Sequence, residues 1–215
     1  MLFCGLEKLF RPLVFFHANR CITLWVVASL CVAGCAEQEL PVYQRSALKT
    51  PSIKDLPSAD VLSVRVSIGR KDTWTAAHRA AMLYFTRSNI RMHWPVFLIL
   101  PDETERAEEE WLFLLPDQGA KLPDPDEVAE RLSERQLRGI RWSLKRLDAL
   151  TVAVYRVNQR PNYAAIRSAT QKLYLAAKKE GWPLLGKPRY AIFANPRLTP
   201  FFMQAFEVQI TTLER

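Results

Sequence analysis

Cysteine is missing from most of this 215-residue chain, since all four cysteines lie within its first 35 residues. They are Cys4, Cys21, Cys31 and Cys35. Everything after Cys35 therefore lacks a thiol, which excludes a cysteine nucleophile and a thiolate metal ligand from the rest of the protein.

Histidine is also scarce. Beyond Cys35 the chain has only His78 and His93, and it contains no Gly-x-Ser-x-Gly sequence. Cysteine, histidine and carboxylate side chains do not cluster with the spacing of a metal site. Hydrolytic triads and zinc sites therefore lack essential parts, and we expect a protein that is not an enzyme.

The apolar stretch 21–34 ("CITLWVVASLCVAG") is shorter than the roughly 20 residues that a membrane-spanning helix needs. It follows basic residues and ends in "VAGC" at 32–35, which resembles the lipobox of bacterial lipoprotein signal peptides. This resemblance predicts a signal peptide at 1–34 and lipidation of Cys35. In lipoproteins, the residue after the lipidated cysteine influences sorting, and Ala36 at this position favours the outer membrane. The protein would then face the periplasm of the bacterial cell envelope. A short membrane anchor or an ordinary cleaved signal is the alternative.

The chain is basic, with a formal net charge of +8. Residues 1–34 carry three Lys or Arg and one Glu, so removing them leaves 8 − 2 = +6. A surface of this charge favours anionic lipid or phosphate groups. We expect a lipid-anchored membrane protein without a nucleic-acid partner, because an exported protein rarely meets nucleic acid.

Three sections are expected after the signal peptide. Residues 35–57 hold the lipid-anchored cysteine and a flexible tether, since the segment has three prolines and no hydrophobic period. Residues 58–215 form the domain, which is divided into a first repeat (about 58–120), a connecting segment (about 121–148) and a second repeat (about 149–215).

Each repeat has the pattern strand, helix, strand, strand. In the first repeat we expect strands at 62–68, 94–100 and 110–116 and a helix at 74–88 capped by Asp72 or Thr73. In the second we expect strands at 150–157, 189–194 and 202–212 and a helix that starts after Asn162 and ends before Gly181.

The connecting segment predicts an amphipathic helix at 126–138, followed at 139–147 by a strand or a continuation of that helix. Its basic residues form a solvated face or a docking patch for lipid headgroups. They are Arg131, Arg135, Arg138, Arg141, Lys145 and Arg146.

These elements predict an α+β fold. Two pseudo-symmetric strand-helix-strand-strand repeats would form a distorted antiparallel sheet or barrel, with two long helices on one face. The other face is left as a trough, and such hollows are natural ligand sites.

Several motifs resemble the SOUL haem-binding family and, more distantly, the gyrase-inhibitor-like effector-binding domains. The matching stretches, over about 58–212, are "MHWPV" (92–96), "FLLP" (113–116), "LPDP" (122–125), "TVAVYRV" (151–157) and "NPRLTPFFMQAFEV" (195–208). The resemblance implies binding of haem, another tetrapyrrole or a similar flat hydrophobic molecule, without turnover. The alternative is a structural or partner-docking lipoprotein whose trough is filled by its own side chains.

Two groups of candidate ligand-binding residues follow from the resemblance. Trp94, Tyr155 and Tyr190 would line a flat cavity, and Glu207 would face the pocket, where glutamates of the effector-binding relatives can meet cationic ligands. The alternatives are that these aromatic residues belong to the core, and that Glu207 faces outward or pairs with Arg189.

Haem iron would be held by His93 or His78, because no other imidazole is left in the mature chain. Haem can also be held by apolar contacts and by arginines that pair with its propionates, without either histidine. His78 lies on the inner stripe of the first helix, so packing in the core is its alternative role.

Overall fold

The computed structural model describes residues 43, 45–67, 72–101, 108–116, 122–125, 127, 139–195, 198–200 and 203–213. These residues belong to one compact unit, Gln38–Arg215. Cys35, the signal peptide 1–34 and most of the predicted helix 126–138 lie outside the described residues. Among the helices that are described, none is long and apolar enough to cross a membrane.

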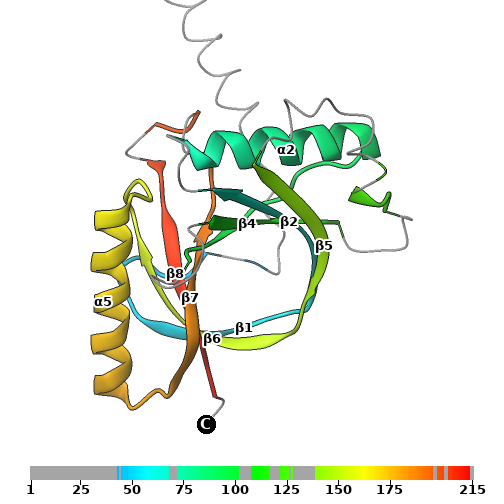
Figure 1. The fold of residues 1–215 in the computed structure, drawn as a ribbon. Coiled ribbons are helices and arrows are strands. Elements are labelled where there is room, and N and C mark those ends of the chain that lie inside the picture. Colours follow the sequence, from blue (N-terminus) through cyan, green and yellow to red (C-terminus); the bar gives the residue numbers. More distant parts are fainter. Residues whose placement is uncertain are drawn as a thin grey trace, which may run out of the picture. The chain divides into compact units, whose positions relative to one another are not determined.

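The described chain follows the predicted order of strands and helices, with one strand added in front (Figure 1). Its elements are β1 (Ser52–Leu56), β2 (Ala59–Ser67), α2 (Thr73–Ser88), β3 (Val96–Ile99), β4 (Glu108–Leu114), β5 (Ile140–Leu147), β6 (Leu150–Val157), α5 (Tyr163–Glu180), β7 (Leu184–Ile192) and β8 (Phe206–Thr212).

All eight strands join one open antiparallel sheet in the order β1-β6-β8-β7-β3-β4-β2-β5. The α+β class and the antiparallel pairing are therefore confirmed, as an open sheet rather than a barrel. The pairing of β3 with β7 lies at the centre, and β1 and β5 form the two edges. The pseudo-symmetric repeats stay a prediction, because strand order alone does not superimpose the two halves.

The two helices begin and end at the residues that the sequence indicated. The Asp72 side chain accepts a hydrogen bond from the Thr75 amide at the start of α2, and Asn162 does the same for Ala165 in α5. Gly181 ends α5 with a φ of 68°, a left-handed conformation that glycine adopts without a steric penalty.

Both helices pack on the same face of the sheet. In Figure 1, α2 lies along the top of the curved sheet and α5 along its left side. Their buried stripes, including Ala77, Ala81, Ile166 and Leu173, join the large hydrophobic core with strand residues of one parity. The small alanine side chains let the helix backbones approach the sheet closely, where aromatic side chains fill the remaining space.

A second, smaller core covers part of the opposite face of the sheet. It contains Tyr43, Leu56, Phe97 and Phe193, together with aliphatic residues of β2, β4 and β6. The expectation of a flexible tether at 35–57 therefore differs from the structure, in which Ser52–Leu56 is an edge strand paired with β6. Strand pairing with a distant segment orders this proline-containing stretch, and no local pattern could indicate that.

The second part of the connecting segment, predicted as a strand or a continued helix, is a strand. Residues 140–147 form β5, which pairs with β2 along its whole length. Its basic side chains contact acids on β4 and on the neighbouring β2. Arg141 contacts Glu108 and Lys145 contacts Glu110, both on β4, and Arg146 approaches Asp60 on β2. These residues form a cross-strand charge lattice.

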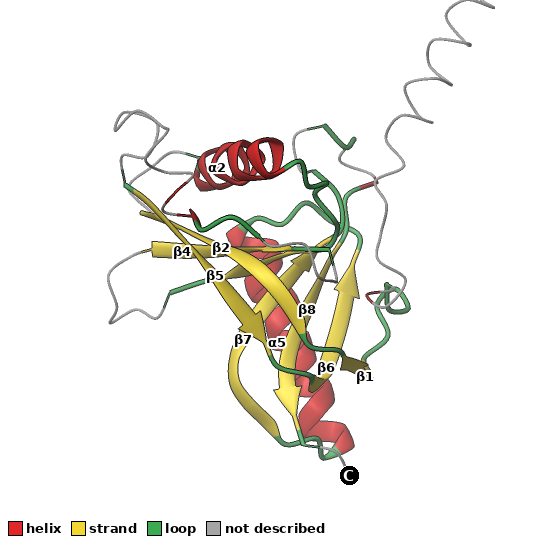
Figure 2. Ribbon diagram, turned by 90° about the vertical axis from the view of Figure 1, so that its right-hand side faces the viewer, coloured by secondary structure: helices red, strands yellow, loops and turns green. Residues whose placement is uncertain are grey.

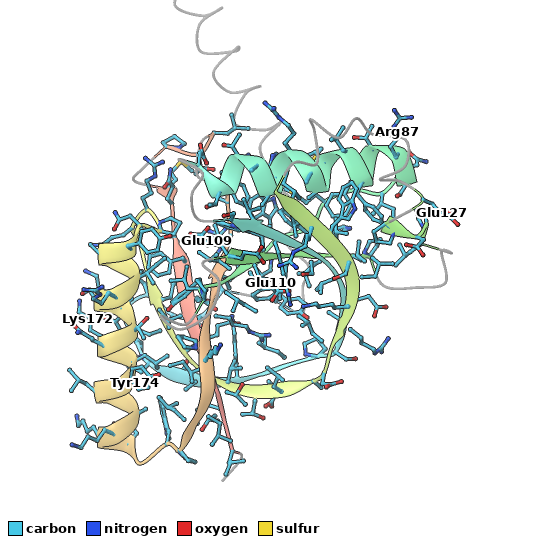
Figure 3. All side chains as sticks on the ribbon, viewed as in Figure 1. Arg87, Glu109, Glu110, Glu127, Lys172 and Tyr174 are labelled. Atoms are coloured by element: carbon cyan, nitrogen blue, oxygen red, sulfur yellow. The ribbon has the colours of Figure 1, made fainter. Side chains whose placement is uncertain are left out.

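One buried carboxylate joins the starts of the two helices. Glu109 on β4 accepts hydrogen bonds from the hydroxyl groups of Thr73 and Tyr163, which are the first residues of α2 and α5. Figure 3 shows Glu109 between these two helix ends. A negative charge near helix amino termini is favourable, because the peptide dipoles point their positive ends toward it.

Candidate functional site

The face of the sheet away from the helices carries most of the charged strand residues, and Figure 2 shows that both helices lie on the other side. We call this face the trough and define it by the side chains that point from its central strands. They are Ser63, Arg65, Phe97, Ile99, Leu112, Glu110, Arg189, Ala191, Glu207 and Gln209.

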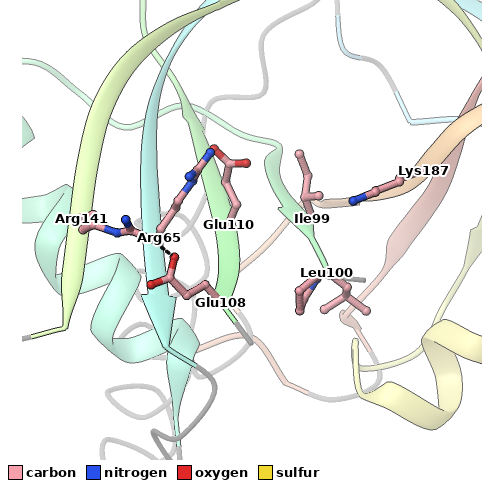
Figure 4. A pocket seen from close by; sticks show the side chains of 8 residues that line it. Arg65, Ile99, Leu100, Glu108, Glu110, Arg141 and Lys187 are labelled. Atoms are coloured by element: carbon pink, nitrogen blue, oxygen red, sulfur yellow. Dashed lines mark hydrogen bonds and ion pairs between the residues drawn. The ribbon is translucent and has the colours of Figure 1, made fainter. Parts of the chain in front are cut away.

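Part of the trough is an open pocket of about 400 Å³. Figure 4 shows its wall, with charged side chains of β2, β4 and β5 on one side and Ile99, Leu100 and Lys187 on the other. The lining residues are Arg65, Ile99, Leu100, Pro101, Glu108, Glu110, Arg141 and Lys187. Its volume falls in the range of small-molecule sites, roughly 300–1,000 Å³.

Glu110 of the pocket is held by three neighbouring side chains. It accepts hydrogen bonds from Lys145 and Ser63, and Arg65 Nε lies 3.6 Å from its carboxylate. Burial alone raises the pKa of Glu110, but the two hydrogen bonds and the neighbouring positive charges outweigh it and lower the pKa below its ordinary value. Glu110 is therefore ionised at neutral pH, as a fixed anion in the pocket wall.

The rest of the trough centres on Glu207, whose side chain is completely buried. Its carboxylate accepts hydrogen bonds from Lys54 Nζ at 2.6 Å, from the Ser46 amide and from Gln209 Nε2 at 3.2 Å. Glu207 does face the trough, but it does not face solvent, and its cation partner is Lys54 rather than Arg189. The alternating pattern of β8 predicted that one side of the strand is polar. It could not indicate that another segment of the chain covers this side.

Residues 43 and 45–56 cover this part of the trough. Tyr43 packs edge-on against Phe97 with ring centroids 5.9 Å apart, and the Arg45 guanidinium lies 5.4 Å from the Phe193 ring centroid. The Lys49 amide donates to the Arg156 carbonyl, and Arg156 donates to the Ser46 carbonyl. We call this region the covered half of the trough, and the region around the pocket the open half.

Arg189 lies between the two halves on β7. Its Nε donates to Gln209 Oε1 at 3.0 Å, and its guanidinium carbon lies 4.8 Å from the Phe97 ring centroid. Burial lowers the pKa of Arg189 to about 10, opposed by its electrostatic interaction with Tyr43. Gln209 thus bridges Arg189 and Glu207 through the two ends of its amide.

The predicted aromatic residues and Glu207 lie on opposite faces. Trp94, Tyr155 and Tyr190 are buried in the large core on the helix side of the sheet. Trp94 lies beside Trp74, and Tyr190 receives a long hydrogen bond from Thr170 on α5. These aromatic residues have the core role that was their alternative, and they do not come together with Glu207 in one site.

The two histidines do not come together in one site: His78 is on α2, and His93 lies just before β3. His78 is half-buried against Trp74, with ring centroids 5.1 Å apart, and burial lowers its pKa. His93 is partly buried, and its Nδ1 has no hydrogen-bond partner among the described residues. Across the described residues there is no group of three or more His, Cys, Asp or Glu that could hold a metal ion.

Haem does not fit these residues well. The ring-lining candidates Trp94, Tyr155 and Tyr190 are already packed against core side chains, and the pocket that is described is lined mainly by charged groups. Haem binding stays a prediction that the geometry does not support.

The sequence search gives no family. No protein-family model matches the chain, and no curated protein matches its sequence. The described fold does resemble solved structures. A hydrolase from Listeria innocua superimposes with a TM-score of 0.55 at 9% identity, over 78% of this chain and 94% of that one. The C-terminal domain of EcmrR gives a TM-score of 0.56 at 14% identity, over 79% and 100%.

A third similar structure is EcmrR in a complex with DNA, with a TM-score of 0.54 and 12% identity over 100% of this chain and 74% of that one. These similarities show a shared fold alone. They transfer neither an activity nor a ligand at such low identity.

Proposed function

We propose that this protein binds a small molecule in the open half of the trough, without turnover. The observation that carries the proposal is the pocket of about 400 Å³ on the helix-free face, where charged groups of several strands converge beside Ile99 and Leu100. A concave site of this volume in which polar groups converge is typical of ligand sites.

The ligand expected for this pocket is polar and charged. Arg65, Arg141 and Lys187 line it together with Glu108 and Glu110, so a bound molecule meets fixed charges on both sides. A flat hydrophobic ring such as a tetrapyrrole has less support, because its aromatic partners lie in the helix-side core.

The test begins with ligands that the protein retains from cells. Native mass spectrometry of the purified full-length protein should detect a small molecule bound at a one-to-one ratio. Ile99→Trp fills the pocket and should lose that molecule, whereas the control Ile53→Trp, at an exposed position of β1, should keep it. If both variants retain the molecule equally, the pocket is not the site.

The tetrapyrrole form of the proposal has its own test. Titration of the full-length protein with haemin should give a saturable Soret shift with single-site stoichiometry if haem is the ligand. A scattering response that does not saturate contradicts haem binding and leaves the proposal for a polar ligand in place.

We also propose that the protein is held on the cell envelope by lipid at Cys35, as the lipobox-like "VAGC" indicates. Cys35→Ser should accumulate as an unprocessed precursor without lipid label. Unchanged processing and unchanged fractionation with membranes would contradict the anchor. The absence of a nucleic-acid partner also stays a prediction, because one of the structures with the same fold is a complex with DNA.

The second candidate function is structural or partner-docking, without a small-molecule ligand. The covered half favours it, because residues 43 and 45–56 already fill that part of the trough with the protein's own side chains. A protein that carries no small molecule, and whose stability Ile99→Trp leaves unchanged, would support this alternative.

A further inference from the structure

Arg189 has no acidic counter-charge in the part of the chain that the structure describes. Among the residues that the structure describes, no carboxylate pairs with it, and Nε is the one nitrogen of its guanidinium that donates a hydrogen bond. Glu207, which lies near it along the same face, is already neutralised by Lys54. Partly buried arginines are normally paired, because removing a positive charge from water is unfavourable.

The position of this guanidinium is fixed from two sides. Gln209, itself fully buried, accepts from Nε with Oε1 while its Nε2 donates to Glu207, so the orientation of its amide is set at both ends. The Phe97 ring, also fully buried, lies beneath the guanidinium carbon at 4.8 Å. The two terminal nitrogens are thereby held in place, and no described residue accepts a hydrogen bond from them.

A guanidinium with its two terminal nitrogens free matches the geometry of a carboxylate, which accepts two parallel N–H···O bonds. Arg189 pairs with Ile99 across β7 and β3, and Ile99 lines the open pocket. Lys187, two residues before Arg189 on β7, also lines it. Arg189 therefore lies next to the pocket and on the same face of the sheet.

We propose that Arg189, oriented by Gln209 and Phe97, is a binding subsite for a carboxylate group of the ligand. The inference rests on the proposed function, since it names the charge class of the molecule that this face takes. Arg189 would act as the positioned charge, and the pocket beside Ile99 would take the rest of the ligand.

The probe is butyrate, compared with butylammonium and inorganic phosphate. Titrations follow the arginine Nε–H resonances of the full-length protein labelled with ¹⁵N-arginine. Butyrate should shift the Arg189 resonance saturably, and phosphate should bind more weakly because it has no apolar chain to place beside Ile99. Butylammonium should leave the resonance unshifted. Saturable binding of butylammonium, or a resonance that no carboxylate moves, would overturn the proposal.

Two variants locate the bound carboxylate. Arg189→Met should weaken butyrate binding roughly tenfold to a hundredfold, the range expected for a lost charge-assisted bidentate pair. Arg141→Met, at an exposed arginine of the open pocket, should change it less than about threefold, as expected for an exposed charge.

Loss of binding in Arg141→Met with retention in Arg189→Met would place the anion among the pocket arginines. That result overturns the Arg189 subsite and leaves the proposed function standing. Arg189→Lys keeps the positive charge but lacks the two parallel N–H donors of the guanidinium, so it should bind butyrate with intermediate affinity. This variant tests the proposal if Arg189→Met does not fold.

A stability readout separates this role from a structural one. Because an unpaired buried charge is unfavourable, Arg189→Met should be no less resistant to urea than the wild type in the absence of ligand. A large loss of stability in Arg189→Met, with unchanged butyrate binding in Arg189→Lys, would make Arg189 a structural residue and contradict the proposal.

Discussion

The two carboxylates of the trough, Glu207 and Glu110, occupy comparable places in the sheet. Each lies on the third strand from an edge, Glu207 on β8 and Glu110 on β4. Each also receives the ammonium group of a lysine from the edge strand on its own side, Lys54 from β1 and Lys145 from β5. The side chains in the two halves are therefore similar in kind.

Their surroundings differ. Glu207 is 0% exposed beneath residues 43 and 45–56, whereas Glu110 is 16% exposed and lines the pocket. The chain that precedes β2 crosses one half of the trough and supplies Lys54, Ser46 and Tyr43 to it. The comparison shows that coverage by this segment, rather than residue type, decides which half is available to a ligand.

Removal of the lysine should have the largest effect in the covered half. Lys54→Met leaves a fully buried carboxylate without its cation, and we expect a loss of about 3–5 kcal/mol in the free energy of unfolding. Lys145→Met should lose less than about 1 kcal/mol, because water reaches Glu110. Urea denaturation measures both, and equal losses would contradict the difference between the halves.

A double variant checks the cause. Glu207→Leu combined with Lys54→Met removes the whole buried pair, and replacing such pairs by apolar groups is often neutral. Most of the stability lost in Lys54→Met should therefore return. If the double variant is as unstable as the single one, the loss has another origin than the unpaired charge.

Truncation of Tyr43 tests whether the covering segment is part of the fold. Tyr43→Ala should lose about 2–4 kcal/mol, since Tyr43 is buried against Phe97 and its removal leaves a cavity. Tyr174→Ala on the exposed face of α5 is the control, with a loss below about 0.5 kcal/mol. An unchanged urea midpoint in Tyr43→Ala would mean that the segment is a tether after all.

The smallest expected effect is the pH dependence of the open half. The pKa of Glu110 in the folded protein lies below its ordinary value of 4.5, so ionised Glu110 stabilises the fold above about pH 4.5. This stabilisation is lost as the pH falls through the lower folded pKa. Glu110→Gln should therefore be less stable than the wild type at neutral pH, and the difference between their urea midpoints should become smaller as the pH decreases below 4.5. A difference independent of pH would contradict this account.

The helices were the most predictable part of the molecule. Asp72, Asn162 and Gly181 act on backbone groups within four residues, so their effect can be inferred from the sequence alone. The strand predicted at 62–68, whose residues alternate in polarity, could also be inferred from its local pattern.

The candidate site was much less predictable. The strand predicted at 110–116 begins two residues earlier in the structure, at Glu108, and Glu109 and Glu110 point to opposite faces of the sheet, where each has its own partners. The roles of Lys54 and Arg189 depend on pairing between strands that are distant in sequence. A possible signal was the alternation of charged residues in β2, β4 and β5, which places opposite charges side by side once the strands are paired.

Glu109 has a consequence for how the molecule opens. Thr73 and Tyr163 start two helices that are far apart in the sequence, and both donate to this one carboxylate. Local unfolding that releases one helix start also removes a hydrogen bond from the acceptor of the other. The first turns of α2 and α5 therefore form one cooperative unit, and their amide hydrogens should exchange with solvent at similar rates, together rather than independently.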